Sequence, residues 1–196
     1  MEGMMSAITW DEGKRTMERY PKEVLNYLVH FHGDRDFFEC HEILEEYWKE
    51  NPGHPYAETL VGLIQVAVGL YHQRRGNKAG AVKMLGSSLA YLKEEDLKGL
   101  GLAGADLIAR VRQRVREAEL DAVPYEDLDL PVEDPSLLEA CKRECALRGF
   151  GWGEASDASN LMLVNRHKLR DRSDVVEERA RQLEARKLRR KGGEDQ

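Results

Sequence analysis

The chain has 196 residues, of which 41% are hydrophobic and 34% are charged, and its formal net charge at pH 7 is −6. This length suits one domain with a substantial core, and no stretch approaches the roughly 18 consecutive apolar residues of a membrane span. Residues 1–10 lack the basic start, apolar centre and small-residue cleavage site of a secretory signal. The sequence therefore argues against a membrane-spanning chain and predicts a cytoplasmic location.

Apolar residues recur at helical spacing along most of the chain, which predicts an all-α fold, a single-domain bundle of antiparallel helix pairs. Pro21 and Asn77 are expected to start two of the helices, and Gly69 should allow a neighbouring helix to approach closely. The expected helices cover residues 21–33, 34–48, 56–76, 77–92 and 105–119, followed by a short helix from Pro135.

The second half of the chain is more polar. Residues 121–135 contain three prolines and six acidic residues, which predicts an extended strap over the surface. Residues 173–190 predict a charged helix, and its interleaved basic and acidic side chains are typical of a solvated helix. We therefore expect a helical bundle domain, 1–153, and a charged helical extension, 154–196.

The three cysteines, Cys40, Cys141 and Cys145, are an odd set without the spacing of a disulfide framework. Cys141 and Cys145 could supply two zinc ligands, but no second Cys or His pair lies at the spacing of a zinc finger. We expect buried, unreactive thiols in a reducing compartment.

Two polar stripes interrupt the apolar helices. Residues three, four and seven apart share a helix face, so His41, Glu45 and Trp48 align on one helix. Gln65 and His72 align on the next helix. If the two helices pack antiparallel, His41, Glu45 and His72 converge and could hold a divalent transition metal, with water at the remaining positions.

Three interpretations of these stripes stay open. The polar groups could bind a metal or a small ligand, with Gln65 and Trp48 as ligand contacts and Glu42 or Glu46 as a catalytic base. They could instead hydrogen-bond one another and fix the packing of the helices. They could also be scattered surface positions that never converge. For Trp48, a core position is favoured over a stacking platform.

A basic turn follows the second stripe. Arg74, Arg75 and Asn77 could bind an anion, because arginine recognises phosphate or carboxylate and the start of the next helix offers free N–H groups. The favoured alternative is that the arginines complement the negative end of the helix dipole.

At these positions the chain resembles domain of unknown function family 309, a family of small helical bacterial and archaeal proteins. The similarity covers residues 30–92 and rests on Phe38, His41-Glu42, Glu45, Trp48, Gly62-Leu-Ile-Gln65, Tyr71-His72 and Gly76-Asn77. The resemblance implies an all-helical fold and no established biochemical activity.

The sequence shows no nucleophile with an adjacent base and no phosphate-binding loop, which favours a non-catalytic module that binds another protein or forms a homo-oligomer. The alternative is a protein that binds a divalent metal or a small ligand, with a metal-dependent hydrolase as one form. Nucleic-acid binding by the basic tail is disfavoured, because the body is acidic and the tail lacks interleaved aromatic residues.

Overall fold

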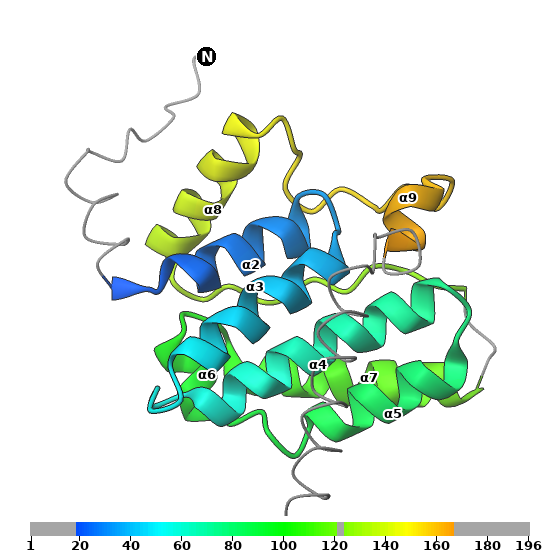
Figure 1. Ribbon diagram of the computed structural model, residues 1–196, viewed down its shortest axis with the longest axis horizontal. Coiled ribbons are helices and arrows are strands. Elements are labelled where there is room, and N and C mark those ends of the chain that lie inside the picture. The colour runs from blue at the N-terminus through cyan, green and yellow to red at the C-terminus, as the bar shows by residue number, and fades with distance from the viewer. Residues whose placement is uncertain (1–18, 121–123, 167–196) are drawn as a thin grey trace, which may run out of the picture. The chain divides into compact units, whose positions relative to one another are not determined.

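The computed structural model describes residues 19–120 and 124–166, whose secondary structure is helical apart from one isolated β-bridge (Figure 1). The all-α fold is thereby confirmed. The helices are α2 (Lys22–His32), α3 (Phe37–Glu50), α4 (Ala57–Arg74), α5 (Lys78–Ser88), α6 (Glu94–Gly99), α7 (Gly104–Leu120), α8 (Pro135–Leu147) and α9 (Leu161–Val164). All belong to the first of two compact units, 1–164 and 165–196. None of these helices is both long and apolar enough to cross a membrane.

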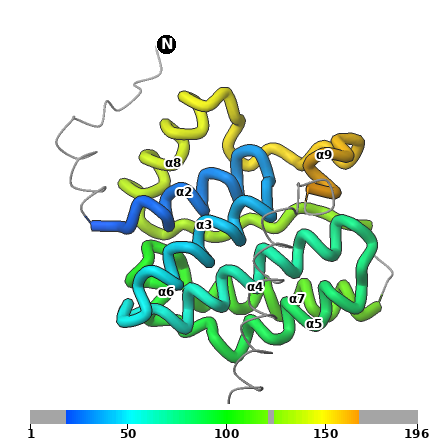
Figure 2. Tube along the Cα trace, viewed as in Figure 1, coloured from blue at the N-terminus to red at the C-terminus, as the bar shows by residue number. Residues whose placement is uncertain are grey.

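Helix α4 lies at the centre of the bundle (Figures 1 and 2). It packs between α3 and α5, while α2 packs on α3, α7 on α5 and α6, and α8 on α2. The buried residues of α4 include Leu60, Leu63, Val66 and Leu70, which spread over more than one face of the helix. A helix with apolar residues on most of its faces is stable only when neighbouring helices cover it. The apolar sequence of α4 therefore explains its central position.

Close contact between α4 and the chain that follows it depends on two glycines spaced seven residues apart. A Cβ added to Gly69 would lie 2.6 Å from Leu85 Cγ, and one added to Gly62 would lie 2.7 Å from Leu92 Cδ2. Both distances are too short for a real contact, so a larger residue would force the packed elements apart. The expectation that Gly69 admits a neighbouring helix is confirmed.

The helix expected over residues 77–92 is shorter than the sequence indicates. Helix α5 ends at Ser88, whose hydroxyl donates to the Leu85 carbonyl at 2.7 Å, and the chain then turns into α6. The sequence does not predict α6, because its six residues include one buried apolar side chain, Leu97, which is too few to show helical spacing.

Residues 124–134 form no helix and run as the expected strap along the helices (Figure 1). The strap also contributes to the core, since Leu128 and Leu130 are buried. Val132 forms the isolated antiparallel bridge with Leu102. The strap is therefore a packed element, rather than a purely superficial one.

The short helix expected after the strap is α8. Pro135 is its first residue, and Asp134 is its N-cap, accepting hydrogen bonds from the backbone N–H groups of Ser136 and Leu137 at 2.8 and 3.3 Å. The charged helix expected over residues 173–190 lies outside the described residues.

All three cysteines are free and buried, as expected. The thiols of Cys40 and Cys145 donate to the carbonyls of Tyr27 and Val29. Burial raises the pKa of Cys141 to about 12 and that of Cys145 to about 11. Neither thiol is therefore ionised at neutral pH, which disfavours a thiolate metal site.

Candidate functional site

Three polar side chains of α3 lie close together. Asp36 is the N-cap of this helix and accepts a hydrogen bond from the Glu39 backbone N–H at 3.0 Å, which fixes the helix start. In the following turns His41 Nδ1 lies 3.0 Å from Glu42 Oε1, and His41 Nε2 lies 3.7 Å from Glu45 Oε2. One possible metal-ligand atom from each of these three residues lies within 4.8 Å of the others.

The His41 ring faces a carboxylate at each nitrogen, at a half-buried position. A neutral imidazole carries one proton, so an Nδ1–H held by Glu42 would leave the Nε2 lone pair free for a metal beside Glu45. Lys49 Nζ lies 3.1 Å from the same Glu45 oxygen and would compete with a cation there. Glu46, the other candidate base, is exposed on the helix surface.

His72 is not part of this group. His72 Nδ1 lies 3.0 Å from Asn77 Nδ2, and burial, with a smaller contribution from the charge of Arg75, lowers the pKa of His72. Gln65, also on α4, has a buried side-chain oxygen that accepts no hydrogen bond from the described residues. Among the described residues, the possible metal ligands that the structure brings together therefore come from α3 alone.

Trp48 lies at the surface with 36% of its area exposed, so the favoured core position is wrong. The core-facing stripe of α3 contains Cys40 and Leu44, which are fully buried, and continues with Tyr47, which packs against the core. Their spacing of four and three residues keeps them on one face. Trp48 belongs to the neighbouring stripe, with the half-buried His41, and therefore faces solvent.

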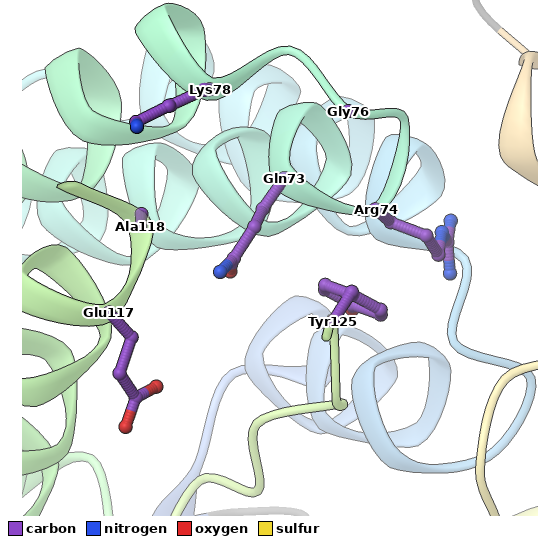
Figure 3. A pocket seen from close by; sticks show the side chains of 7 residues that line it. All are labelled: Gln73, Arg74, Gly76, Lys78, Glu117, Ala118 and Tyr125. Carbon is purple, nitrogen blue, oxygen red and sulfur yellow. The ribbon is translucent and has the colours of Figure 1, made fainter. Parts of the chain in front are cut away.

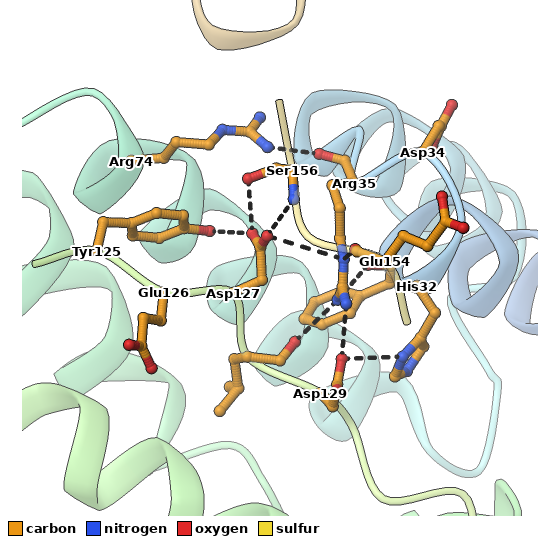
Figure 4. Close-up of polar contacts among 12 residues, drawn as sticks. His32, Asp34, Arg35, Arg74, Tyr125, Glu126, Asp127, Asp129, Glu154 and Ser156 are labelled. Carbon is orange, nitrogen blue, oxygen red and sulfur yellow. Dashed lines mark hydrogen bonds and ion pairs between the residues drawn. The ribbon is translucent and has the colours of Figure 1, made fainter. Parts of the chain in front are cut away.

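Arg74, at the end of α4, is engaged within the protein (Figure 4). Its Nη1 donates to the Arg35 carbonyl at 2.7 Å and its Nη2 donates to the Leu163 carbonyl at 3.5 Å. The guanidinium also lies 4.7 Å from the centre of the Phe37 ring. Arg74 therefore ties α4 to the start of α3 and to α9, and these contacts occupy donors that an anion would need.

The turn after Arg74 is a helix-capping structure. Gly76 has a φ of 71°, in the left-handed region where many helices end. Asn77 then accepts a hydrogen bond from the Gly80 backbone N–H at 3.0 Å, which confirms the predicted N-cap of α5. The guanidinium of Arg75 lies 5.0 Å from the centre of the Tyr71 ring. These contacts account for the basic turn without a bound anion.

A hollow of about 280 Å³ opens between the ends of α4 and α7 (Figure 3). Its lining consists of Gln73, Arg74, Gly76, Lys78, Glu117, Ala118 and Tyr125. The Gln73 amide and the Tyr125 ring face the hollow, whereas the Arg74 side chain points away from it. A ligand in this hollow would therefore meet the amide and the aromatic ring before it met the guanidinium.

The sequence does not predict a charged cluster around the buried Arg35, in the turn between α2 and α3 (Figure 4). Arg35 is 2% exposed and has a φ of 56°, which is uncommon for a residue with a side chain. Its guanidinium donates to the carbonyls of Phe31, Leu128 and Glu154 and, at 2.8 Å, to Asp129 Oδ1. One side chain thus joins α2, the strap and the segment after α8.

Asp127 extends the cluster along the strap. Tyr125 Oη donates to Asp127 Oδ1 at 2.7 Å, and Ser156 donates to this carboxylate from its hydroxyl and its backbone N–H. Arg35 Nε lies 4.0 Å from Asp127 Oδ2. Burial raises the pKa of Tyr125 well above its ordinary value, so its hydroxyl remains a donor at neutral pH.

His32 borders the same cluster and is 1% exposed. Its ring stacks on Trp152 with the ring centres 4.2 Å apart, and its Nδ1 lies 3.5 Å from Asp129 Oδ1. The Gly153 backbone N–H donates to the His32 carbonyl at 2.9 Å. Burial lowers the pKa of His32, although Asp129 acts in the opposite direction.

Local spacing could not have revealed this cluster. Arg35 lies 94 residues before Asp129 and 119 residues before Glu154. The available signal was the acidic strap itself, because carboxylates in a segment that packs on helices require basic or hydrogen-bonding partners.

Comparison with known proteins places the polar helices in a family. The profile described as "Domain of unknown function (DUF309)" matches residues 24–84, which include α3 and α4. The chain is also similar to the "Uncharacterized protein YpuF" of Bacillus subtilis (strain 168), with 45% identity over 170 residues, 86% of this chain and 97% of that protein. No solved structure gives a significant match. The resemblance noted in the sequence is confirmed, and the chain belongs to the family of domain of unknown function 309.

Proposed function

We propose that the protein is a non-catalytic helical interaction module whose partner-binding surface is the exposed stripe of α3. The observation that carries this proposal is the exposure of Trp48 beside charged residues of the same helix. Tryptophan is among the residues that contribute most binding energy in protein interfaces, where polar and charged side chains usually surround it. His41, Glu45 and Lys49 would form that polar rim.

The use of the other polar candidates within the protein supports a binding role over a catalytic one. Arg74 donates to backbone carbonyls, and Asn77 caps α5. Glu45 pairs with Lys49, and His41 is held by Glu42. In this proposal, these contacts fix the helices that present Trp48.

The test compares Trp48→Ala with Tyr91→Ala, because Tyr91 has nearly the same exposure, 37% against 36%, and lies at the turn after α5. A photo-crosslinking residue in place of Lys49 would trap the partner in cells, and mass spectrometry would identify it, with sedimentation showing whether it is a second copy. We expect Trp48→Ala to weaken the affinity measured with that purified partner by about tenfold or more.

Tyr91→Ala should leave the affinity unchanged. Equal affinities for Trp48→Ala and the unaltered protein would overturn the assignment of the surface, as would equal losses in both variants. Circular dichroism of each variant checks that the fold is retained, so that a loss of binding can be assigned to the side chain.

A second candidate function, binding of a divalent metal, is supported by the short distances among the α3 side chains. His41 Nε2 and Glu45 would be the ligands, and Glu42 would orient the ring through Nδ1, the arrangement that most metal-bound histidines share. Two protein ligands on one helix predict a weak site completed by water. A metal-dependent hydrolase would use Glu46 as its base, because Glu42 is engaged with the imidazole.

Calorimetric titration of the untagged protein with Zn²⁺ tests this candidate. His41→Ala should abolish binding, and Lys49→Ala should tighten it, because the competing ammonium is removed. His72→Ala separates the site on α3 from one shared with α4: it should leave the affinity unchanged if α3 alone supplies the ligands. No saturable heat with Zn²⁺ would exclude a zinc site at this position.

A further inference from the structure

A second hollow, of about 420 Å³, lies where the start of α2, the turn after α3 and the end of α6 meet. Side chains that line it include Lys22, Glu23, Tyr47, His54 and Tyr56. Its volume falls in the range of small-molecule sites, and its lining combines tyrosine rings with charged and polar side chains. His41, Glu42 and Glu45 do not line this hollow, so a ligand bound in it would not use the polar side chains of the function proposed above.

The His54 ring is held in one orientation and one tautomer. Its Nδ1 accepts a hydrogen bond from the Tyr56 backbone N–H at 3.1 Å, so the proton of the neutral ring lies on Nε2. The rings of Tyr47 and Tyr56 meet the imidazole edge-on, with centres 5.5 and 5.6 Å away. Within the described residues Nε2 has no partner, so this residue of the lining carries an oriented and unused donor.

Lys22 supplies a positive charge that no described residue neutralises. The structure shows no ion pair or hydrogen bond between its ammonium and any described residue. Arg19, which also lines the hollow, is neutralised by Asp134 at 2.9 Å. The acid of the lining is Glu23, next to Lys22. The Lys22 ammonium, unpaired among the described residues, and the His54 N–H belong to residues that line one hollow beside tyrosines, and both are donors suited to an oxyanion.

We propose that this hollow binds a small phosphomonoester that carries a planar ring. The phosphate would accept hydrogen bonds from Lys22 Nζ and His54 Nε2, and the ring would pack against Tyr47 and Tyr56. A phosphate fits better than a neutral ligand, because its several acceptor oxygens match these donors. Glu23 makes the charge of the ligand testable. Removal of its negative charge should strengthen the binding of an anion and weaken the binding of a cation.

The test is a titration of the ¹⁵N-labelled full-length protein with phenyl phosphate, followed by amide chemical shifts. We expect shifts confined to the lining residues and their neighbours, around Lys22, Tyr47, His54 and Leu100. Lys22→Gln and His54→Asn should each weaken binding by about tenfold, the equivalent of one charge-assisted hydrogen bond. Asparagine at position 54 keeps an acceptor for the Tyr56 N–H and removes the Nε2 donor together with the imidazole ring.

Lys83→Gln is the matched control, because Lys83 is exposed on α5 and lines neither hollow described above. It should bind phenyl phosphate as the unaltered protein does, and Glu23→Gln should bind it more tightly. Benzoate in place of phenyl phosphate distinguishes a phosphate site from a general carboxylate site, and equal binding of both would overturn the phosphate assignment. Shifts spread over lysines throughout the chain, or equal affinities in Lys22→Gln, His54→Asn and the control, would overturn the site itself.

Discussion

The polar stripe on α3 and the charged cluster around Arg35 differ in how their contacts are made. Contacts within the stripe join residues one to four positions apart on a single helix, such as His41 with Glu45, and the side chains remain partly exposed. Arg35 is buried and contacts residues more than 90 positions away, including Asp129. The two regions contain the same kinds of charged group in opposite physical settings.

This difference separates a surface that is available for binding from a structural connection. Exposed pairs spaced along one helix contribute little to stability, so their side chains are free to serve another purpose. A buried guanidinium has lost its hydration, and it is tolerated because carbonyl and carboxylate oxygens replace the water. We therefore expect substitutions in the cluster to affect folding and substitutions in the stripe to affect binding.

The largest expected effect is that of Arg35→Met, which keeps much of the apolar stem but removes every hydrogen bond to α2, the strap and the segment after α8. Leaving a buried acceptor without its donor costs about 1–3 kcal/mol, and because several acceptors lose their donor here we expect a loss of about 3 kcal/mol or more. Urea unfolding followed by circular dichroism measures it. Arg112→Met, at an exposed position of α7, is the control and should change stability by less than about 0.5 kcal/mol. Similar losses in both variants would contradict the structural role of the cluster.

A pair of glycines extends the comparison from charges to packing. Gly69→Ala should destabilise the protein by about 1–3 kcal/mol, because the new Cβ meets Leu85 of α5. Gly86→Ala should instead stabilise it by about 0.5–1 kcal/mol, because α5 gains helix propensity and the Cβ finds no atom within 4 Å. The same unfolding measurement gives both values. If the two changes had the same sign, long-range packing would not be what distinguishes these positions.

Sequence reasoning succeeded best for long helices and for caps made by neighbouring residues. Helical spacing predicted the all-α fold, and the cap at Asn77 follows from short-range hydrogen bonding. The prediction of a core position for Trp48 failed. Adjacent residues such as Tyr47 and Trp48 differ by about 100° around a helix, and α3 turns Tyr47, rather than Trp48, toward the core. Sequence reasoning missed Arg35 because nothing near that residue in the chain indicates partners in the strap.

In the candidate site, too, contacts within one helix were predictable and contacts between elements were not. The proximity of His41 to Glu45 follows from four-residue spacing on one helix, and the structure contains it. The convergence with His72 required the relative rotation of two helices, which spacing does not determine. The hollow around His54 draws on the start of α2, on α3, on the turn after α3 and on the end of α6, so no single segment of sequence marks it.

A smaller effect is expected in the pH dependence of stability. Burial lowers the pKa of His32 below its value in the unfolded chain, near 6.5, so the unfolded state binds the proton more readily. The free energy of unfolding should therefore decrease as the pH falls below about 6.5. Asp129 makes this decrease smaller, because its negative charge favours the protonated His32 ring in the folded protein. His32→Phe, which retains an aromatic ring against Trp152, should flatten the change in urea midpoint between pH 7 and pH 5.

The lowered pKa of His72 acts in the same direction and is retained in that variant, so some slope should remain. An unchanged slope in His32→Phe would mean that His32 does not take up a proton on unfolding in this range. Below about pH 4 a separate loss should appear, because the nearby His32 ring and the Arg35 guanidinium hold the pKa of Asp129 well below its usual range.

The smallest expected effect is that of Glu45→Ala, and its comparison with Asp129→Ala tests which property separates the two regions. By exposure alone, Asp129 should be the more tolerant position, since its side chain is 54% exposed against 38% for Glu45. The burial of their ion-pair partners predicts the reverse order. Lys49, the partner of Glu45, is mostly exposed, whereas Arg35, the partner of Asp129, is buried and would lose its 2.8 Å carboxylate contact. We expect Glu45→Ala to cost at most about 0.5 kcal/mol and Asp129→Ala to cost clearly more. If urea unfolding gave the opposite order, the exposure of the substituted side chain, rather than the burial of its partner, would determine the stabilising contribution of these ion pairs.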